Sequence, residues 1–385
     1  MLIAAALLAL TAAEDPAAGR PVPGGTFFYF APPRAADHEA VIVSNEGAGP
    51  DRERRQQVIR SGSWLREGPI GAGAGAIYSD FEGAISIAFS RDQAGHYRTL
   101  AIDRHASTDT FHRYRRARTG ARERVLGEDC EVWNSARVGA GSDHEIDLLS
   151  CETADGIQLW SRTVVRRTGA VIEQSRTLSF RRRAVRPDEV RPPLDLLRPL
   201  YWRALAGTPE AGAPAGHEIR LAMEGDRSAQ AWRVIRRRGD WAFVATGDQG
   251  GTERTSLETP TLAIQYETEA GGRPVRLSIH PQPPRPIASG AAAFEPIPPP
   301  QSERVLGEEC VWSGPSSAHG IVVTSGEHRE CLTADGLPLR IFSAHHVVSA
   351  DLVAIRVSRR APSAESMLPP AAAFDWARWG VTFGD

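Results

Sequence analysis

The sequence predicts a mainly β protein of the α+β class, built from two tandem homologous antiparallel-sheet domains that each carry a few helices. Three observations lead to this prediction. A long segment occurs twice, most of each copy alternates polar and apolar residues, and Asp-Gly pairs separate the alternating runs. Alternation at period two is typical of half-buried strands, and Asp-Gly between two such runs predicts a tight hairpin.

The repeat is clearest around the four cysteines. Arg124-Val-Leu-Gly-Glu-Asp-Cys130 returns as Arg304-Val-Leu-Gly-Glu-Glu-Cys310, and 21 residues after each of these cysteines comes Cys151-Glu-Thr-Ala-Asp-Gly156 or Cys331-Leu-Thr-Ala-Asp-Gly336. Upstream, Val58-Ile-Arg60 and Trp64 match Val234-Ile-Arg236 and Trp241. A repeat of this length indicates a duplicated domain rather than a solenoid unit.

The repeat and the local composition divide the chain into five parts. We expect a signal peptide at 1–13, a flexible Pro/Gly/Ala-rich leader at 14–35, a first β-rich domain at 36–205, a linker at 206–216 and a second β-rich domain at 217–385. The linker reads Ala-Gly-Thr-Pro-Glu-Ala-Gly-Ala-Pro-Ala from residue 206 to 215, which is typical of a segment between domains.

The expected elements follow from the same patterns. Strands are predicted at 85–89, 130–137, 144–151, 157–165 and 262–266, where apolar and polar residues alternate. Helices are predicted after the two Pro-Pro pairs, at 194–205 and 371–379, and a third is expected near 53–59.

The cysteine spacing indicates one disulfide in each copy. If 130–137 and 144–151 form an antiparallel hairpin, Cys130 lies directly opposite Cys151, at the ~4.5–5.5 Å Cα separation that a disulfide accepts. Four cysteines allow three connectivities, and free thiols or a four-cysteine metal site are the rival interpretations. The duplication favours Cys130–Cys151 and Cys310–Cys331, and the absence of Cys-x-x-Cys pairs argues against zinc.

The sequence shows no catalytic machinery, cofactor site or metal site. All 45 basic residues are arginine, so lysine-dependent nucleophiles and phosphate loops are impossible. The His-Glu dipeptides at His38, His144 and His217 are not followed by a second histidine at i+4, and no Gly-x-Ser-x-Gly occurs. The net charge of −2 gives no whole-chain attraction to nucleic acid.

The first thirteen residues are apolar and end in small residues, as a secretory signal peptide does. No other stretch is apolar over the length that a membrane-spanning helix needs. We therefore expect a periplasmic or secreted bacterial protein that does not span the membrane.

The order of these segments resembles the periplasmic lipoprotein-carrier superfamily, the Lol-type half-barrels. The residues that carry the resemblance are Arg60–Trp64, Gly127–Cys130 and Thr153–Leu159, with counterparts Gly307–Cys310 and Thr333–Leu339. The resemblance implies half-barrel-like domains in which a curved sheet wraps an apolar cavity closed by helices. It assigns no ligand-binding residue, since the tandem arrangement and the cysteine pairs are not general features of carriers.

Three functions remain open on this basis. The first is a non-enzymatic periplasmic protein that binds or carries a lipid, another apolar ligand or a lipidated protein. The second is a module that presents its sheets to an envelope protein. The third is a hydrolase whose acidic site is assembled from distant residues.

Overall fold

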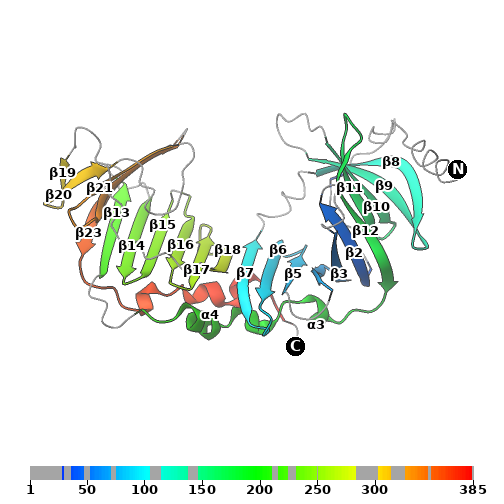
Figure 1. The fold of residues 1–385 in the computed structure, drawn as a ribbon, viewed down its shortest axis with the longest axis horizontal. Coiled ribbons are helices and arrows are strands. Elements are labelled where there is room, and N and C mark those ends of the chain that lie inside the picture. Colours follow the sequence, from blue (N-terminus) through cyan, green and yellow to red (C-terminus); the bar gives the residue numbers. More distant parts are fainter. Residues whose placement is uncertain are drawn as a thin grey trace, which may run out of the picture. The chain divides into compact units, whose positions relative to one another are not determined.

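The computed structural model describes residues 28–29, 36–46, 53–70, 75–104, 114–137, 146–209, 216–223, 231–248, 250–282, 302–313, 326–345 and 348–383. The predicted signal peptide, nearly all of the predicted leader and the centre of the predicted linker lie outside these ranges. The described residues form antiparallel strands with a few short helices, which confirms the predicted fold class (Figure 1). Within these ranges, no helix is both long and apolar enough to cross a membrane.

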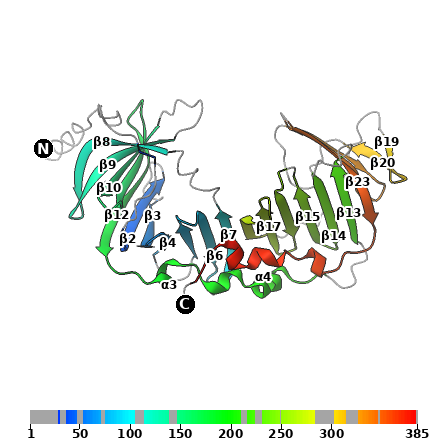
Figure 2. The ribbon, with the colours of Figure 1, turned by 180° about the vertical axis from the view of Figure 1, so that it is seen from behind.

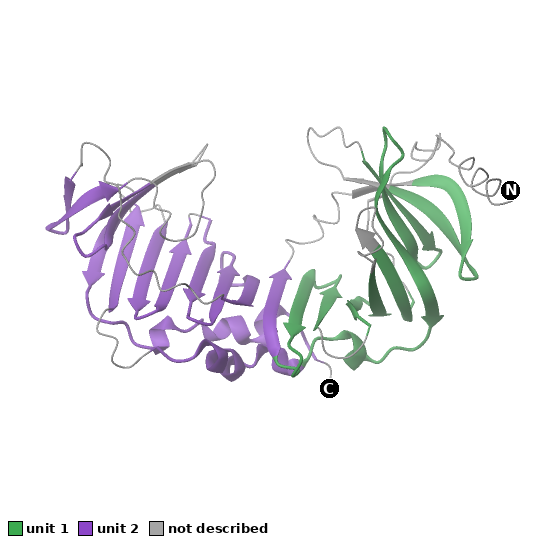
Figure 3. Cartoon of the chain, viewed as in Figure 1, with its two compact units in different colours: residues 1–96, 105–193 green, residues 97–104, 194–385 purple. Residues whose placement is uncertain are grey.

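The chain divides into two compact units, coloured separately in Figure 3. Unit 1 comprises 1–96 and 105–193, and unit 2 comprises 97–104 and 194–385. The units therefore differ from the predicted domains in two places: Tyr97–Arg104 and the helices after Pro193 belong to unit 2. The duplication itself stays a prediction from the sequence.

Unit 1 is one antiparallel sheet with the strand order β1–β8–β9–β10–β11–β12–β2–β3–β4–β5–β6. The first long strand of the unit, β2, pairs with the last, β12, so the meander folds back on itself. The elements are β1 Phe28–Tyr29, β2 His38–Glu46, β3 Glu53–Ser61, β4 Trp64–Pro69, β5 Gly75–Asp80, β6 Ile85–Arg91, β8 Tyr114–Val125, β9 Glu128–Arg137, β10 Ile146–Thr153, β11 Gln158–Val165, β12 Val171–Arg182 and α3 Pro187–Val190.

Unit 2 repeats the order from β8 to β6 as β19–β20–β21–β22–β23–β13–β14–β15–β16–β17, and β18 and β7 follow at the end. Its strands are β7 Tyr97–Arg104, β13 Gly216–Met223, β14 Trp232–Arg238, β15 Trp241–Gly247, β16 Glu253–Glu258, β17 Leu262–Thr268, β18 Pro274–Pro281, β19 Ser302–Val305, β20 Glu308–Ser313, β21 Gly326–Leu332, β22 Pro338–His345 and β23 Val348–Ser358. Its helices are η2 Leu194–Leu197, α4 Pro199–Ala206, η4 Glu365–Met367, η5 Ala371–Phe374 and α5 Trp376–Trp379 (Figure 2).

The two predicted helical regions after the Pro-Pro pairs are present, each broken into a 3₁₀ turn and an α-helical segment. Each region buries one tryptophan, and each indole donates to a carbonyl six residues earlier: Trp202 Nε1 to Leu196 O at 2.8 Å, and Trp379 Nε1 to Ala373 O at 3.0 Å. The N–H group of each buried indole therefore has a hydrogen-bond acceptor within its own helical region.

The predicted helix near 53–59 is wrong, because these residues form β3. The local composition, rich in Glu, Arg and Gln, suits a helix, but β3 is paired along its length with β2 on one side and β4 on the other. Burial of Val58 and Ile59 within these ladders outweighs the local preference.

Both disulfides are formed as predicted, Cys130–Cys151 and Cys310–Cys331, with Cα separations of 5.4 and 5.3 Å. The predicted direct opposition is wrong by two residues. Thr153 pairs with Cys130, and Cys151 pairs with Val132, so the bridge runs diagonally between β9 and β10. The sulfur-bearing residues are buried in the core of each unit, where they pack with apolar residues such as Leu159 and Leu339.

Candidate functional site

Unit 1 contains a pocket that is lined by residues of β2, β3 and β4 and of the turn that follows β10. Its volume is about 200 Å³. An apolar cavity of about 150 Å³ is enough to hold benzene, so this pocket can take a ring or a short stretch of alkyl chain. The lining residues are His38, Ala40, Ile42, Val58, Arg60, Leu65, Glu67, Phe81, Glu152, Gly156, Ile157 and Gln158.

Strand alternation explains why apolar residues line the pocket. Ala40 and Val58 face each other across β2 and β3, and Val58 in turn faces Glu67 across β3 and β4. Because directly opposed residues in antiparallel strands share a face, these side chains form one row across the sheet. Ile157 completes the wall from the turn after β10, where its amide donates to Thr153 Oγ1 at 2.9 Å.

His38 is a buried histidine whose hydrogen bond fixes its tautomer. Its Nδ1 lies 2.8 Å from the carbonyl oxygen of Ala36, and its side chain is 5% exposed. A carbonyl only accepts, so Nδ1 donates and Nε2 of the neutral ring is left as an acceptor. Burial lowers the pKa of the imidazole, and the positive charge of Arg60 adds to this effect. His38 is therefore neutral at pH 7 and contributes a hydrogen-bond acceptor rather than a charge.

The other two histidines of the His-Glu dipeptides do not extend this site. His217 occupies the position in unit 2 that corresponds to His38, directly opposite Arg237 on β14, and burial lowers its pKa as well. His144 lies outside the described residues.

Arg60 brings a positive charge to the pocket. Its guanidinium carbon lies 5.1 Å from the centre of the Phe81 ring, and its Nε donates to the Gly62 carbonyl at 3.4 Å. Burial lowers the pKa of this guanidinium, which is 9% exposed as a residue. Such a group stays charged because arginine titrates far above neutral pH.

The two carboxyl groups of the pocket have different surroundings. Glu152 is buried and accepts a hydrogen bond from Ser150 Oγ at 2.8 Å. Glu67 is partly buried, and among the residues that the structure describes no hydrogen bond or ion pair reaches its carboxyl group. Burial raises the pKa of Glu67. It is thus a desolvated acid that lacks a partner within the described part of the chain.

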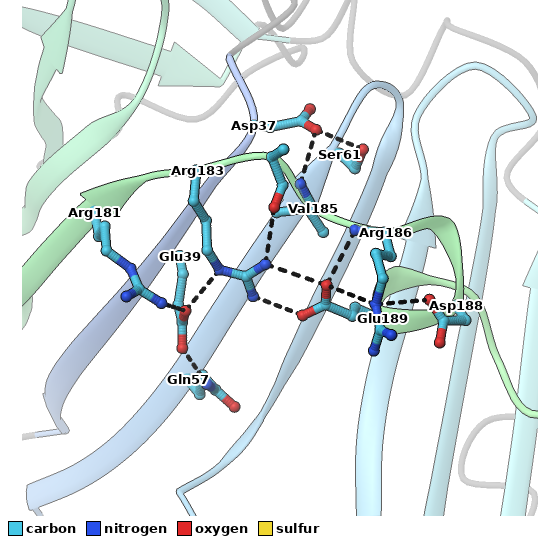
Figure 4. Close-up of polar contacts among 11 residues, drawn as sticks. Asp37, Glu39, Gln57, Ser61, Arg181, Arg183, Val185, Arg186, Asp188 and Glu189 are labelled. Atoms are coloured by element: carbon cyan, nitrogen blue, oxygen red, sulfur yellow. Dashed lines mark hydrogen bonds and ion pairs between the residues drawn. The ribbon is translucent and has the colours of Figure 1, made fainter.

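A second polar cluster lies outside the pocket and is closed on itself (Figure 4). Arg183 donates to Glu39 at 2.9 Å and to both carboxylate oxygens of Glu189 at 3.1 and 2.6 Å. Hydrogen bonds from Arg183, and then from the backbone of Arg186, lower the pKa of Glu189 to about 2. Glu39 also accepts from Gln57 at 2.6 Å. Since its acids are already paired, this cluster anchors α3 to the sheet rather than offering a reactive group.

An arginine clamp is present next to each disulfide. In unit 1, Arg182 contacts Glu128 at 2.6 Å and Asp155 at 3.0 Å. In unit 2, the clamp is formed by Arg359, which contacts Glu308 at 2.5 Å and Asp335 at 2.9 Å. Glu128 and Glu308, which follow the Leu-Gly turns, thus connect the last strand of each unit to its disulfide hairpin.

The sequence analysis included Arg60 and Ile157 only as parts of the carrier-like pattern. It did not identify Ala40, Glu67 or Glu152 as pocket residues. One signal was available. Leu65 and Glu67 share a strand face with period two, so an acid stands where the pattern expects an apolar residue.

No protein-family model and no curated protein matches this sequence. Among solved structures, MucB is similar over 88% of this chain and 92% of its own length, at 12% identity and a TM-score of 0.28. An uncharacterized conserved protein from Thermus thermophilus is similar over 41% of this chain and 86% of its own, also at 12% identity and a TM-score of 0.28. At these TM-scores neither likeness bears on the fold or the function.

Proposed function

We propose that the chain is an exported, non-enzymatic binding protein whose first unit holds an apolar ligand, or the acyl chain of a lipid or lipidated partner, in the unit 1 pocket. The observation that carries the proposal is the pocket itself: about 200 Å³ with apolar walls from three strands and polar groups at a few positions. Small-molecule sites are typically concave and mostly apolar, with few polar groups that orient the ligand.

Two further observations support the proposal. Two disulfides fit an oxidising compartment, as expected for a periplasmic or secreted protein. At two positions that correspond to the pocket lining, unit 2 carries a larger or an apolar residue, which makes unit 1 the better candidate for binding. Ile219 stands where unit 1 has Ala40, and Leu332 where it has Glu152.

The test begins with protein exported to a bacterial periplasm and purified without detergent. Native mass spectrometry reports a retained lipid, and uptake of the uncharged probe N-phenyl-1-naphthylamine reports an apolar site. Replacing Ala40, which is 3% exposed, by isoleucine adds three carbon atoms to the pocket wall and should abolish probe uptake. Ala170→Ile, at an exposed position of the same unit, is the matched control and should leave uptake unchanged. Failure of the wild-type protein both to retain lipid and to take up the probe would overturn the proposal.

A module that contacts an envelope protein is the second candidate, and one observation favours it. The two-residue turns between β8 and β9 and between β19 and β20 place Leu126 and Leu306 at φ +53°, with 51% and 55% of each residue exposed. A leucine is costly in the left-handed region and gains nothing from exposure. Crosslinking in cells that recovers one stoichiometric partner, lost when both leucines are replaced, would favour this function over ligand binding.

A further inference from the structure

The chemistry of the ligand can be inferred from the one titratable group of the pocket for which the described residues offer no partner. This step rests on the function proposed above and concerns the same pocket. Three of the titratable groups that line it have a partner within the protein: His38 donates to the Ala36 carbonyl, Arg60 contacts Gly62 and the Phe81 ring, and Glu152 accepts from Ser150. The fourth is Glu67.

The residues directly opposite Glu67, and the lining residue next to it on β4, are apolar. The residues directly opposite it are Val58 on β3 and Ile77 on β5, and the lining residue next to it on the same face of β4 is Leu65. None of these side chains can donate a hydrogen bond. A carboxylate removed from water without a donor is destabilised, and it gains most from an oppositely charged group that enters the same space.

The fold does not require an acid at this position. The hairpins β3–β4 and β14–β15 have the same register, because Ser61 pairs with Trp64 and Arg238 pairs with Trp241 across two-residue turns. Glu67 therefore corresponds to Val244, which faces Ile235 in the same way as Glu67 faces Val58. Unit 2 forms the same ladder with an apolar residue, so the carboxyl group of Glu67 serves something other than the sheet.

The charges of the pocket favour a cation. Among the lining residues, Glu67 and Glu152 are two acids against the guanidinium of Arg60, and His38 is neutral. A ligand carboxylate would meet two like charges, whereas a ligand ammonium would meet the unpartnered one. We propose that the ligand of the unit 1 pocket carries a protonated primary amine, which the Glu67 carboxylate holds while an apolar body lies against Leu65 and Val58.

The experiment compares octylamine, 1-octanol and octanoate as competitors that displace N-phenyl-1-naphthylamine from the full chain at pH 7. A charge-assisted hydrogen bond in a partly desolvated site favours the amine by about tenfold over the alcohol. Octanoate should displace the probe less well than octanol. In Glu67→Gln the advantage of the amine should disappear while octanol binds as before, and Glu173→Gln, an exposed acid of the same unit, should behave as wild type.

A second measurement does not depend on any variant. The amine preference of the wild-type protein should fall as the pH is lowered and Glu67 becomes protonated, while displacement by octanol stays constant. Glu152, His38 and Arg60 are the other charged or titratable groups facing the pocket. Equal displacement of the probe by octylamine and by octanol at pH 7 would refute an amine as the ligand group, while the apolar site would still be supported. If the wild-type protein neither retains lipid nor binds the probe, the proposed function itself fails.

The amine can belong to a free small molecule or to a lipid headgroup, and ethylamine separates these sources. Displacement by ethylamine at the same concentrations as octylamine identifies a small free amine as the ligand. Displacement by octylamine alone identifies an amphiphile.

Discussion

Removal of one disulfide offers the sharpest test of how the units are stabilised. Replacing Cys130 and Cys151 together by alanine opens a loop of 21 residues without leaving a free thiol. Loop-closure entropy for this separation gives a loss of about 3 kcal/mol in the free energy of unfolding. With an m-value of about 2 kcal/mol/M for urea, the unfolding midpoint of unit 1 should fall by about 1.5 M.

Hydrogen exchange followed by mass spectrometry measures this loss separately in each unit, because the slowest amides report the free energy of opening of their own cooperative region. Peptides from β9–β11 should lose protection, and those from β20–β22 should not. The matched double variant at Cys310 and Cys331 opens a loop of the same length and should reverse this pattern. A loss below about 1 kcal/mol in both variants would refute the loop-closure argument.

Three other perturbations have defined outcomes. Leu126→Asn places a residue that tolerates φ > 0 in a primed turn, so urea unfolding should show unit 1 stabilised by about 1 kcal/mol. Hydrogen bonds from Arg359, then Thr333, lower the pKa of Asp335 from 3.8 to about 2. This pairing stabilises the fold above pH 4 and is lost as the pH falls toward 2, so unfolding measured across that range should be less pH-dependent in Arg359→Gln. Trp202→Ala removes a fully buried indole and should cost about 3–5 kcal/mol in the same assay.

The sequence predicted the strands that have one buried face and one partly exposed face. In β6, Ile85, Ile87 and Phe89 are buried and the residues between them are partly exposed, as the alternation indicated. The Asp155-Gly156 turn and the pairing of the cysteines were also predicted from the local sequence. These features depend on neighbours along the chain, which is why a single sequence was enough to predict them.

The diagonal disulfide depended on information that the sequence does not contain. The prediction assumed a symmetric hairpin centred midway between Cys130 and Cys151. In the structure, Cys130 pairs with Thr153, and β10 has an irregular register with β11 directly after Cys151. The same irregularity follows Cys331 in unit 2. A bulge is set by pairing on both sides of a strand, so the spacing of two residues cannot reveal it.

The pocket escaped prediction for a related reason. In the sequence, Val58-Ile-Arg60 matches Val234-Ile-Arg236. In the structure, the register of the hairpins β3–β4 and β14–β15 makes Val58 correspond to Ile235 instead. The match of Trp64 to Trp241 already aligns Glu67 with Val244, but the sequence alone does not show that Glu67 faces Val58 across the hairpin and shares a pocket with residues of β2 and β10.

The contrast between corresponding positions is the reason that the proposed binding site is placed in unit 1. Where unit 2 has Ile219, Val244 and Leu332, unit 1 has a small residue and two acids, Ala40, Glu67 and Glu152. Smaller side chains leave space, and partly buried carboxyl groups lower the stability of the fold unless they are paired. The apolar residues of unit 2 form the same strand ladder without leaving a space and without burying a carboxyl group. A sheet with an unfilled space and an acid that lacks a partner among the described residues is stabilised by a ligand that fills the space and pairs with the acid. The proposed amine-bearing apolar ligand would do both.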